Sequence, residues 1–96
     1  MNVQWDDEKN RQNQSKHGLS FEEAKQLFVS GIDYYEIPDE FHSNREERFI
    51  AIGPISRGIV LVVWTERSEN TIRIISARFA TRREQELYQR HLEGLI

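Results

Sequence analysis

The chain has 96 residues, which is enough for one domain with one hydrophobic core, so we expect residues 1–96 to form a single domain. A formal charge of −3 argues against a protein that coats nucleic acid through bulk charge, and the lack of cysteine excludes disulfides and thiolate chemistry. The sequence has no apolar run of about 18 residues and starts with polar and acidic residues. We therefore expect no membrane span, no signal peptide and a cytoplasmic location.

The N-terminal residues predict a short edge strand followed by a polar helix. We expect the strand over Val3–Trp5 and the helix over Asp6–His17, because the helix has an N-capping aspartate, acids in its first turn and bases in its last. Gly18 then stands where a left-handed C-terminal cap is favoured. Because this helix is polar on every side, we expect it to pack mainly through Trp5 and Leu19 at its ends.

A second helix begins at a capping box, in which Ser20 is the N-cap and Glu23 stands three residues later. It ends at Ser30–Gly31. Apolar residues recur between these limits at the spacing of one helix face, which predicts a core face made of Phe21, Ala24, Leu27 and Phe28.

The middle of the chain is rich in β-branched and aromatic residues and predicts strands. The expected ranges are Ile32–Ile37, Arg48–Ile52, Ile59–Trp64 and Thr71–Phe79, with a hairpin turn at 68–70. The range Ile59–Trp64 is apolar on both faces, which is typical of a central strand that is covered on each side.

The last strand contains an irregularity in its pattern. Strict alternation would place Arg73 and Arg78 on opposite faces, and Ile74 and Ile75 are adjacent apolar residues. A β-bulge at this point would bring Arg73, Ser76 and Arg78 to one face and the aliphatic side chains to the other. We therefore predict a bulge in the middle of this strand.

A final helix begins at a second capping box, Thr81–Glu84, and carries an apolar stripe of Leu87, Tyr88, His91, Leu92 and Leu95. The order of elements predicts an α+β domain with two N-terminal helices, a mainly antiparallel sheet of three to four strands and a C-terminal helix. We expect the helices to pack on one face of the sheet and the other face to stay partly open.

Charge is unevenly distributed along the chain. The segment 67–90 contains six arginines (67, 73, 78, 82, 83 and 90) against three acids (69, 84 and 86), so it carries +3 and the remainder −6. The guanidinium fork suits bidentate binding of phosphate or carboxylate. This bias indicates a local anion site or a solvated surface with ordinary ion pairs.

Short motifs spread along most of the chain resemble the BrnT toxin family, which belongs to the RelE-like fold group. Each motif is weak alone, but their order and spacing are specific. One departure lies in the first helix, which is rich in Asn and Gln where the family usually has some Ala and Leu. The matching segments are Trp5–Asp6, Lys16–Gly18, Ser20–Ala24, His42–Ser43, Glu46–Arg48, Ile52–Gly53, Leu61–Val63, Thr65–Arg67, Ile72–Arg78, Ala80–Glu84 and Tyr88.

The resemblance implies a RelE-like fold and a metal-independent endoribonuclease that stops translation by cutting RNA. It also implies a cognate antitoxin of the BrnA type, which carries a DNA-binding domain, so that operator DNA is bound only through the antitoxin. A heterotetramer, in which an antitoxin dimer bridges two toxins, is the assembly that the family suggests. No cofactor is implied.

Metal-free RNA cleavage requires a proton acceptor for the 2′-hydroxyl, a grip on the phosphate, stabilisation of the phosphorane and a proton for the 5′-oxygen. Arg78 is our first candidate for the phosphate grip, or else a strand arginine paired with Glu47 or Glu84. Arg73 joins it if the bulge exists. His17 is a candidate acid or base and Lys16 a candidate phosphate ligand, although both also suit the last turn of a helix. Glu47 is a candidate general base, or forms a structural ion pair.

Further residues are candidates for binding RNA: Arg48, His42, Arg82 and Arg83. The last two suit either RNA or an acidic surface of the antitoxin, and His42 also suits catalysis or the start of a loop. We expect Glu84 to serve as the capping-box partner and His91 to be a packing residue. The spacing of histidines and acids predicts no metal site, and no glycine-rich phosphate loop is present.

Two other functions remain open at this stage. One is a non-catalytic interaction module whose basic face binds an acidic partner. The other is a single-stranded nucleic-acid-binding protein, which needs exposed aromatic side chains for base stacking. Tyr34, Tyr35, Phe79 and Tyr88 are the aromatic candidates, although we expect all four to pack within the fold.

Overall fold

Capping residues start the helices as the sequence predicts. The computed structural model describes residues 1–42 and 45–96, and within these ranges it has three helices: α1 (Asp7–His17), α2 (Phe21–Val29) and α3 (Arg82–Leu92). Asp6 caps α1 by accepting a hydrogen bond from the Lys9 amide, and capping boxes start α2 and α3. Ser43, in the predicted motif His42–Ser43, lies outside the described residues.

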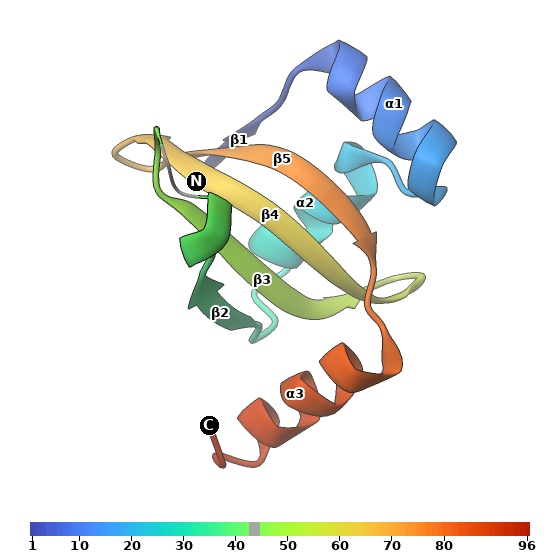
Figure 1. Cartoon of the computed structure of the whole chain (residues 1–96), viewed down its shortest axis with the longest axis vertical. Helices are drawn as coiled ribbons and strands as arrows, with labels where there is room; N and C mark the ends of the chain where they lie inside the picture. Colours follow the sequence, from blue (N-terminus) through green and yellow to red (C-terminus); the bar gives the residue numbers. More distant parts are fainter. Residues whose placement is uncertain (43–44) are drawn as a thin grey trace.

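One mixed sheet forms the centre of the molecule (Figure 1). Within the described ranges its order is β1-β5-β4-β3-β2, with β1 parallel to β5 and every other pair antiparallel. The expectation of a mainly antiparallel sheet of three to four strands is therefore correct in part: three of the four pairings are antiparallel, but the sheet has five strands and is mixed. The outer strands β1 and β2 overlap the expected segments Val3–Trp5 and Ile32–Ile37, so the error lies in the number of strands counted in the sheet and not in where the strands lie. The bounds are β1 (Asn2–Gln4), β2 (Tyr35–Pro38), β3 (Arg48–Ile55), β4 (Gly58–Ser68) and β5 (Thr71–Phe79), with a 3₁₀ turn η1 (Glu40–His42) after β2.

The helices lie on both faces of the sheet, whereas we expected them on one. One core cluster joins Phe21, Ala24 and Leu27 of α2 to Val60 and Val62 of β4. A second cluster, on the opposite face, joins Tyr88 of α3 to Ile52, Leu61 and Ala80. Figure 1 shows α1 and α3 at opposite ends of the molecule with the sheet between them. Because β4 is apolar on both faces, burial of only one face would leave half of its side chains in water.

Helix α1 also packs through buried asparagines, which corrects the expectation that it packs mainly through Trp5 and Leu19 at its ends. Asn13 is 7% exposed, and its side chain bonds both backbone groups of Ala77 on β5: Nδ2 donates to the carbonyl at 2.7 Å, and Oδ1 accepts from the amide at 3.1 Å. Nδ2 also donates to the Leu19 carbonyl at 2.8 Å. Asn10 Oδ1 accepts from the Phe21 amide. These bonds dock a polar helix against the outer edge of β5.

The predicted bulge in β5 is confirmed. Val63 of β4 pairs with Ser76, whereas the next residue, Trp64, pairs with Ile74, so Ile75 is the extra residue. Ile72, Ile74 and Ala77 consequently enter the α2 side of the core, and their polar neighbours turn to the opposite face. The arginines of β5 thus share one face of the sheet.

Candidate active site

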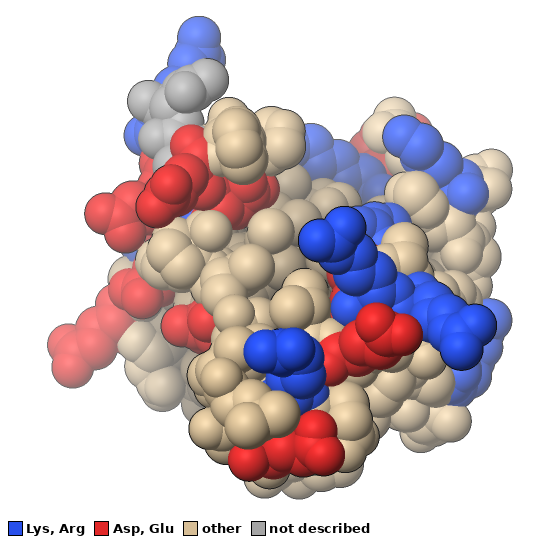
Figure 2. All heavy atoms as spheres, turned by 60° about the horizontal axis from the view of Figure 1, so that its bottom comes forward, with Lys and Arg blue, Asp and Glu red and all other residues tan. Residues whose placement is uncertain are grey.

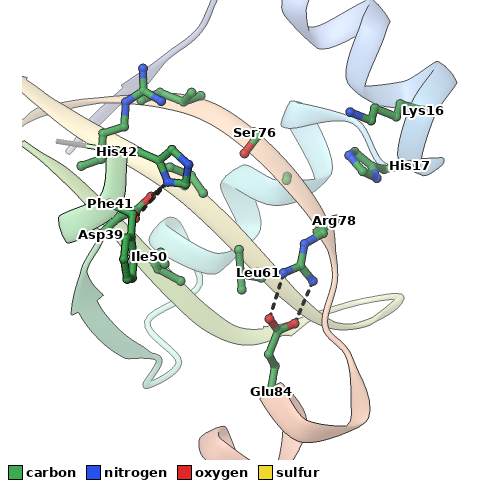
Figure 3. A pocket seen from close by; sticks show the side chains of 14 residues that line it. Lys16, His17, Asp39, Phe41, His42, Ile50, Leu61, Ser76, Arg78 and Glu84 are labelled. Atoms are coloured by element: carbon green, nitrogen blue, oxygen red, sulfur yellow. Dashed lines mark hydrogen bonds and ion pairs between the residues drawn. The ribbon is translucent and has the colours of Figure 1, made fainter. Parts of the chain in front are cut away.

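A groove of about 550 Å³ lies on the α3 face of the sheet, beside the part that α3 covers (Figure 3). Its apolar floor is made by Ile50, Leu61 and Val63 of the two central strands. Its size falls within the usual range of ligand sites, about 300–1,000 Å³. Charged and polar side chains surround this floor from α1, η1, β3, β5 and the first turn of α3, and they include Lys16, His17, Asp39, His42, Arg48, Ser76, Arg78 and Glu84.

Arg78 is fixed at one end of the groove by a bidentate ion pair. Its Nη1 and Nη2 donate to the two carboxylate oxygens of Glu84 at 2.7 and 2.8 Å. The same carboxylate accepts the Thr81 amide at 2.8 Å in the capping box of α3. The hydrogen bonds from Arg78 lower the pKa of Glu84 to about 2, and the bond to Glu84 raises the pKa of Arg78. The alternative prediction, that Arg78 pairs with Glu84, is therefore confirmed.

His42 lies on another side of the groove and is oriented by a buried acid. Its Nδ1 lies 3.0 and 3.1 Å from the two carboxylate oxygens of Asp39, which is 7% exposed. The imidazole itself is mostly exposed. A carboxylate at Nδ1 favours the tautomer that carries its proton there, so Nε2 of the neutral ring is the nitrogen that accepts a proton.

Lys16 and His17 approach from the last turn of α1, across the groove from His42 (Figure 3). Lys16 is exposed and His17 is half-buried. The Asn13 bonds to β5 set the position of this turn, because they join α1 to the strand that carries Ser76. The polar helix is thus the element that brings two candidate residues to the site.

Of three further candidates, one lines the groove and two lie outside it. Arg48 lines the groove, and its guanidinium lies 3.7 Å from Glu46. Arg73 shares the face of Arg78 but lies outside the groove, where its Nη1 donates to the Gln4 side chain at 3.5 Å. The Glu47 side chain is exposed and also outside the groove.

Arg82 and Arg83 are exposed in the first turn of α3. Arg82 lies 3.9 Å from Glu86, and neither arginine lines the groove. His91 packs beside Tyr35, with ring centroids 5.2 Å apart, and bonds Asp33, so the structure confirms it as a packing residue.

A family model for the ribonuclease toxin BrnT of type II toxin–antitoxin systems matches residues 5–84. The chain belongs to the BrnT family. The match includes every residue of the groove. Membership of a type II toxin family implies a protein antitoxin as the partner.

The crystal structure of the ribonuclease toxin BrnT of Brucella abortus is similar to this BrnT chain. It is 27% identical, with a TM-score of 0.67, and the alignment covers 85% of this chain and 99% of that one. No curated protein matches the chain. The expected membership of the BrnT family is confirmed.

Charge is unevenly distributed over the surface of this BrnT chain. Figure 2 shows many of its Lys and Arg side chains on the right of the face it presents and many Asp and Glu side chains on the left, with some of each sign on the other side. No cluster of three or more His, Cys, Asp or Glu side chains that suits a metal ion occurs among residues 1–42 and 45–96. In the same ranges, no helix is both long and apolar enough to cross a bilayer.

Among the groove residues that sequence reasoning did not name as candidates are Asp39 and Phe41. A signal for Asp39 exists in the sequence, because an acid three residues before His42 can orient its imidazole within one helical turn. The burial of Asp39, which identifies it as more than a surface acid, depends on the packing of β2, η1 and β3. Phe41 has no such signal, since an isolated phenylalanine ordinarily predicts a core position.

Proposed function

We propose that this BrnT chain is a metal-independent endoribonuclease that cuts RNA in the groove. The observation that carries the proposal is the arrangement of side chains: one groove gathers a buttressed arginine, two histidines on opposite sides and a lysine. These are the groups that RNA cleavage requires without a metal ion.

In the proposed reaction the 2′-oxygen attacks the phosphorus, so the P–O2′ bond forms and the P–O5′ bond breaks. A base takes the proton of the 2′-hydroxyl and an acid gives one to the departing 5′-oxygen. The products are a 2′,3′-cyclic phosphate and a 5′-hydroxyl. No redox partner or metal ion takes part in this balance.

Arg78 holds the phosphate. Glu84 takes one N–H from each terminal nitrogen, and the Phe79 carbonyl accepts a second hydrogen from Nη1 at 3.3 Å. Among the described residues, the Nε hydrogen and the second Nη2 hydrogen of Arg78 meet no acceptor. These two hydrogens lie on one edge of the guanidinium, and that edge binds two phosphate oxygens in parallel. Lys16 and Arg48 add positive charge for the phosphorane.

His42 and His17 carry out the two proton transfers, one from the 2′-hydroxyl and one to the 5′-oxygen. Asp39 orients His42 through Nδ1, which suits His42 to act as the base at Nε2, and His17 stands across the groove as the acid. Glu47 is not retained as the base, because its side chain lies outside the groove. Arg73, Arg82 and Arg83 lie around the site and extend the binding surface for RNA or for the antitoxin.

The partner in this proposal is a BrnA-type antitoxin that covers the basic rim of the groove, carries a DNA-binding domain and joins two toxins in a heterotetramer. The complex binds operator DNA through the antitoxin. Without the antitoxin, RNA cleavage in the bacterial cytoplasm stops translation.

The experiment is incubation of the purified, antitoxin-free chain with total bacterial RNA in the presence of EDTA. We expect degradation with 2′,3′-cyclic phosphate ends, and a loss of rate of about 10²–10³-fold in Arg78→Ala. Arg90→Ala, at an exposed position of α3 outside the groove, is the matched control and keeps the parent rate. A parent chain that leaves free RNA and ribosome-bound mRNA intact overturns the proposal. So does an Arg78→Ala variant that cuts at the parent rate while circular dichroism shows it folded.

A further inference from the structure

Phe41 is an exposed aromatic side chain at the groove. It is 91% exposed, more than any other large apolar residue that the structure describes. It precedes His42 in η1 and lines the groove together with Asp39 and Ile50 (Figure 3). Folding ordinarily buries phenylalanine, and an uncovered ring in a groove that also holds Lys16, Arg48 and Arg78 suits a ligand that combines an apolar face with negative charge.

The turn that carries Phe41 is anchored. The Asp39 amide donates to the Arg48 carbonyl of β3 at 2.8 Å, and the Asp39 side chain is buried. The ring therefore projects from a fixed point next to the proposed base, His42, and does not belong to a loose end of the chain.

The other aromatic candidates for base stacking are occupied within the fold. Tyr34 packs edge-on against Phe28 at 5.5 Å between ring centroids, and Tyr35 packs against His91. The Phe79 ring lies under the Arg57 guanidinium at 5.1 Å, and Tyr88 is buried. Of the residues the structure describes at the groove, Phe41 is the one Phe, Tyr or Trp that offers a face to a ligand.

We propose that Phe41 is a base-stacking residue, on which the nucleobase next to the scissile phosphate lies when single-stranded RNA occupies the groove. The phosphate then lies toward Arg78 and the base lies over the apolar side formed by Phe41 and Ile50. The placement beside the scissile phosphate rests on the proposed function, whereas the stacking itself requires only that RNA binds.

A consequence is preference for single strands. Bases in a duplex are already stacked and paired, so their faces are not available to an aromatic side chain, whereas an unpaired base has an open π-face. Stacking tolerates every base, so the contact selects unpaired RNA and not a sequence.

The test measures binding separately from cleavage. The probe is a short fluorescent single-stranded RNA with 2′-O-methyl groups, which removes the nucleophile, and its affinity for the purified chain is read by anisotropy. We expect Phe41→Ala and Phe41→Leu to weaken binding about 5- to 150-fold, the range for loss of one base–aromatic stack, and Phe41→Trp to retain it. Leu95→Ala, an exposed apolar control outside the groove, keeps the parent affinity. The matching duplex binds the parent weakly and does not respond to Phe41→Ala.

The outcomes separate this inference from the ribonuclease proposal. If the parent chain cleaves no RNA but its affinity for the probe depends on the ring of Phe41, the stacking proposal stands and the ribonuclease proposal is overturned. A parent chain that cleaves RNA while Phe41→Ala keeps the parent affinity and KM overturns the stacking alone. Equal affinity of Phe41→Leu and the parent also overturns it, because an aliphatic contact then suffices. If Phe41→Ala weakens only the antitoxin complex, the ring belongs to a protein interface and the inference is wrong.

Discussion

Replacement of Asn13 by alanine tests whether a polar helix is held by the amide of one side chain. The variant removes three hydrogen bonds and leaves three buried backbone groups without the Asn13 partner: the amide and carbonyl of Ala77 and the carbonyl of Leu19. At about 0.5–1.5 kcal/mol for each bond, the free energy of unfolding falls by about 2–4 kcal/mol. For a domain of this size, that loss lowers Tm by roughly 10–30 °C.

Urea and thermal unfolding, followed by circular dichroism, measure this loss. Gln12→Ala, on the exposed side of the same helix, is the control and changes stability by less than about 0.5 kcal/mol. Asn13→Asp keeps the acceptor but loses both donors, so it too falls well below the parent. An Asn13→Ala variant with the stability of Gln12→Ala would refute the view that these bonds dock α1. Because α1 carries Lys16 and His17, we also expect Asn13→Ala to cleave RNA more slowly at temperatures where it stays folded.

The remaining predictions concern pH, packing and proton transfer. The pKa of Glu84 falls from 4.5 to about 2 on folding, so its stabilisation is present above pH 4.5 and is lost as the pH falls toward 2. Measurement of the free energy of unfolding from pH 7 to pH 2 checks this prediction. An equally steep loss of stability with falling pH in Glu84→Gln contradicts it. Gly53→Ala places a Cβ 2.7 Å from Leu27 Cδ1, so we expect a destabilisation of about 1–3 kcal/mol in urea, and an unchanged midpoint refutes the close packing. Asp39→Asn lowers kcat about 100-fold and alters the pH–rate profile, since it removes the acid that orients His42. Parent-like kcat and profile would remove this dyad from the mechanism.

Local signals in the sequence predicted the starts of the helices and the irregular strand correctly, whereas the expected apolar stripe of the last helix runs to Leu95, beyond the end of α3 at Leu92. Each cap depends on a few adjacent residues, and the bulge follows from the spacing of Arg73 and Arg78 with two isoleucines between them. Caps and bulges are determined by short segments of sequence, so they can be predicted without knowledge of the tertiary fold.

The docking of α1 and the position of α3 were not predicted correctly, because both depend on contacts between distant residues. Hydrophobic periodicity treats an asparagine as a surface residue, and only the partner strand shows that Asn13 replaces a missing strand neighbour. The sequence did indicate that β4 is covered on both sides, but not which helix covers each side.

The candidate site was predicted in part. Lys16, His17, His42, Arg48 and Arg78 do meet at one groove, whereas Glu47 and Arg73 do not line it. The sequence does not show where along a strand the groove ends. A residue can therefore share a strand or a motif with the site and still lie outside the groove.

One carboxylate both caps α3 and holds Arg78. In many enzymes the catalytic groups strain the fold, so mutations that improve stability reduce activity. Here the same side chain serves the start of a helix and the proposed phosphate grip, so natural selection for a stable fold and for a functional toxin would act on position 84 in the same direction. A substitution at position 84 would therefore reduce the stability of the fold and the proposed phosphate grip together.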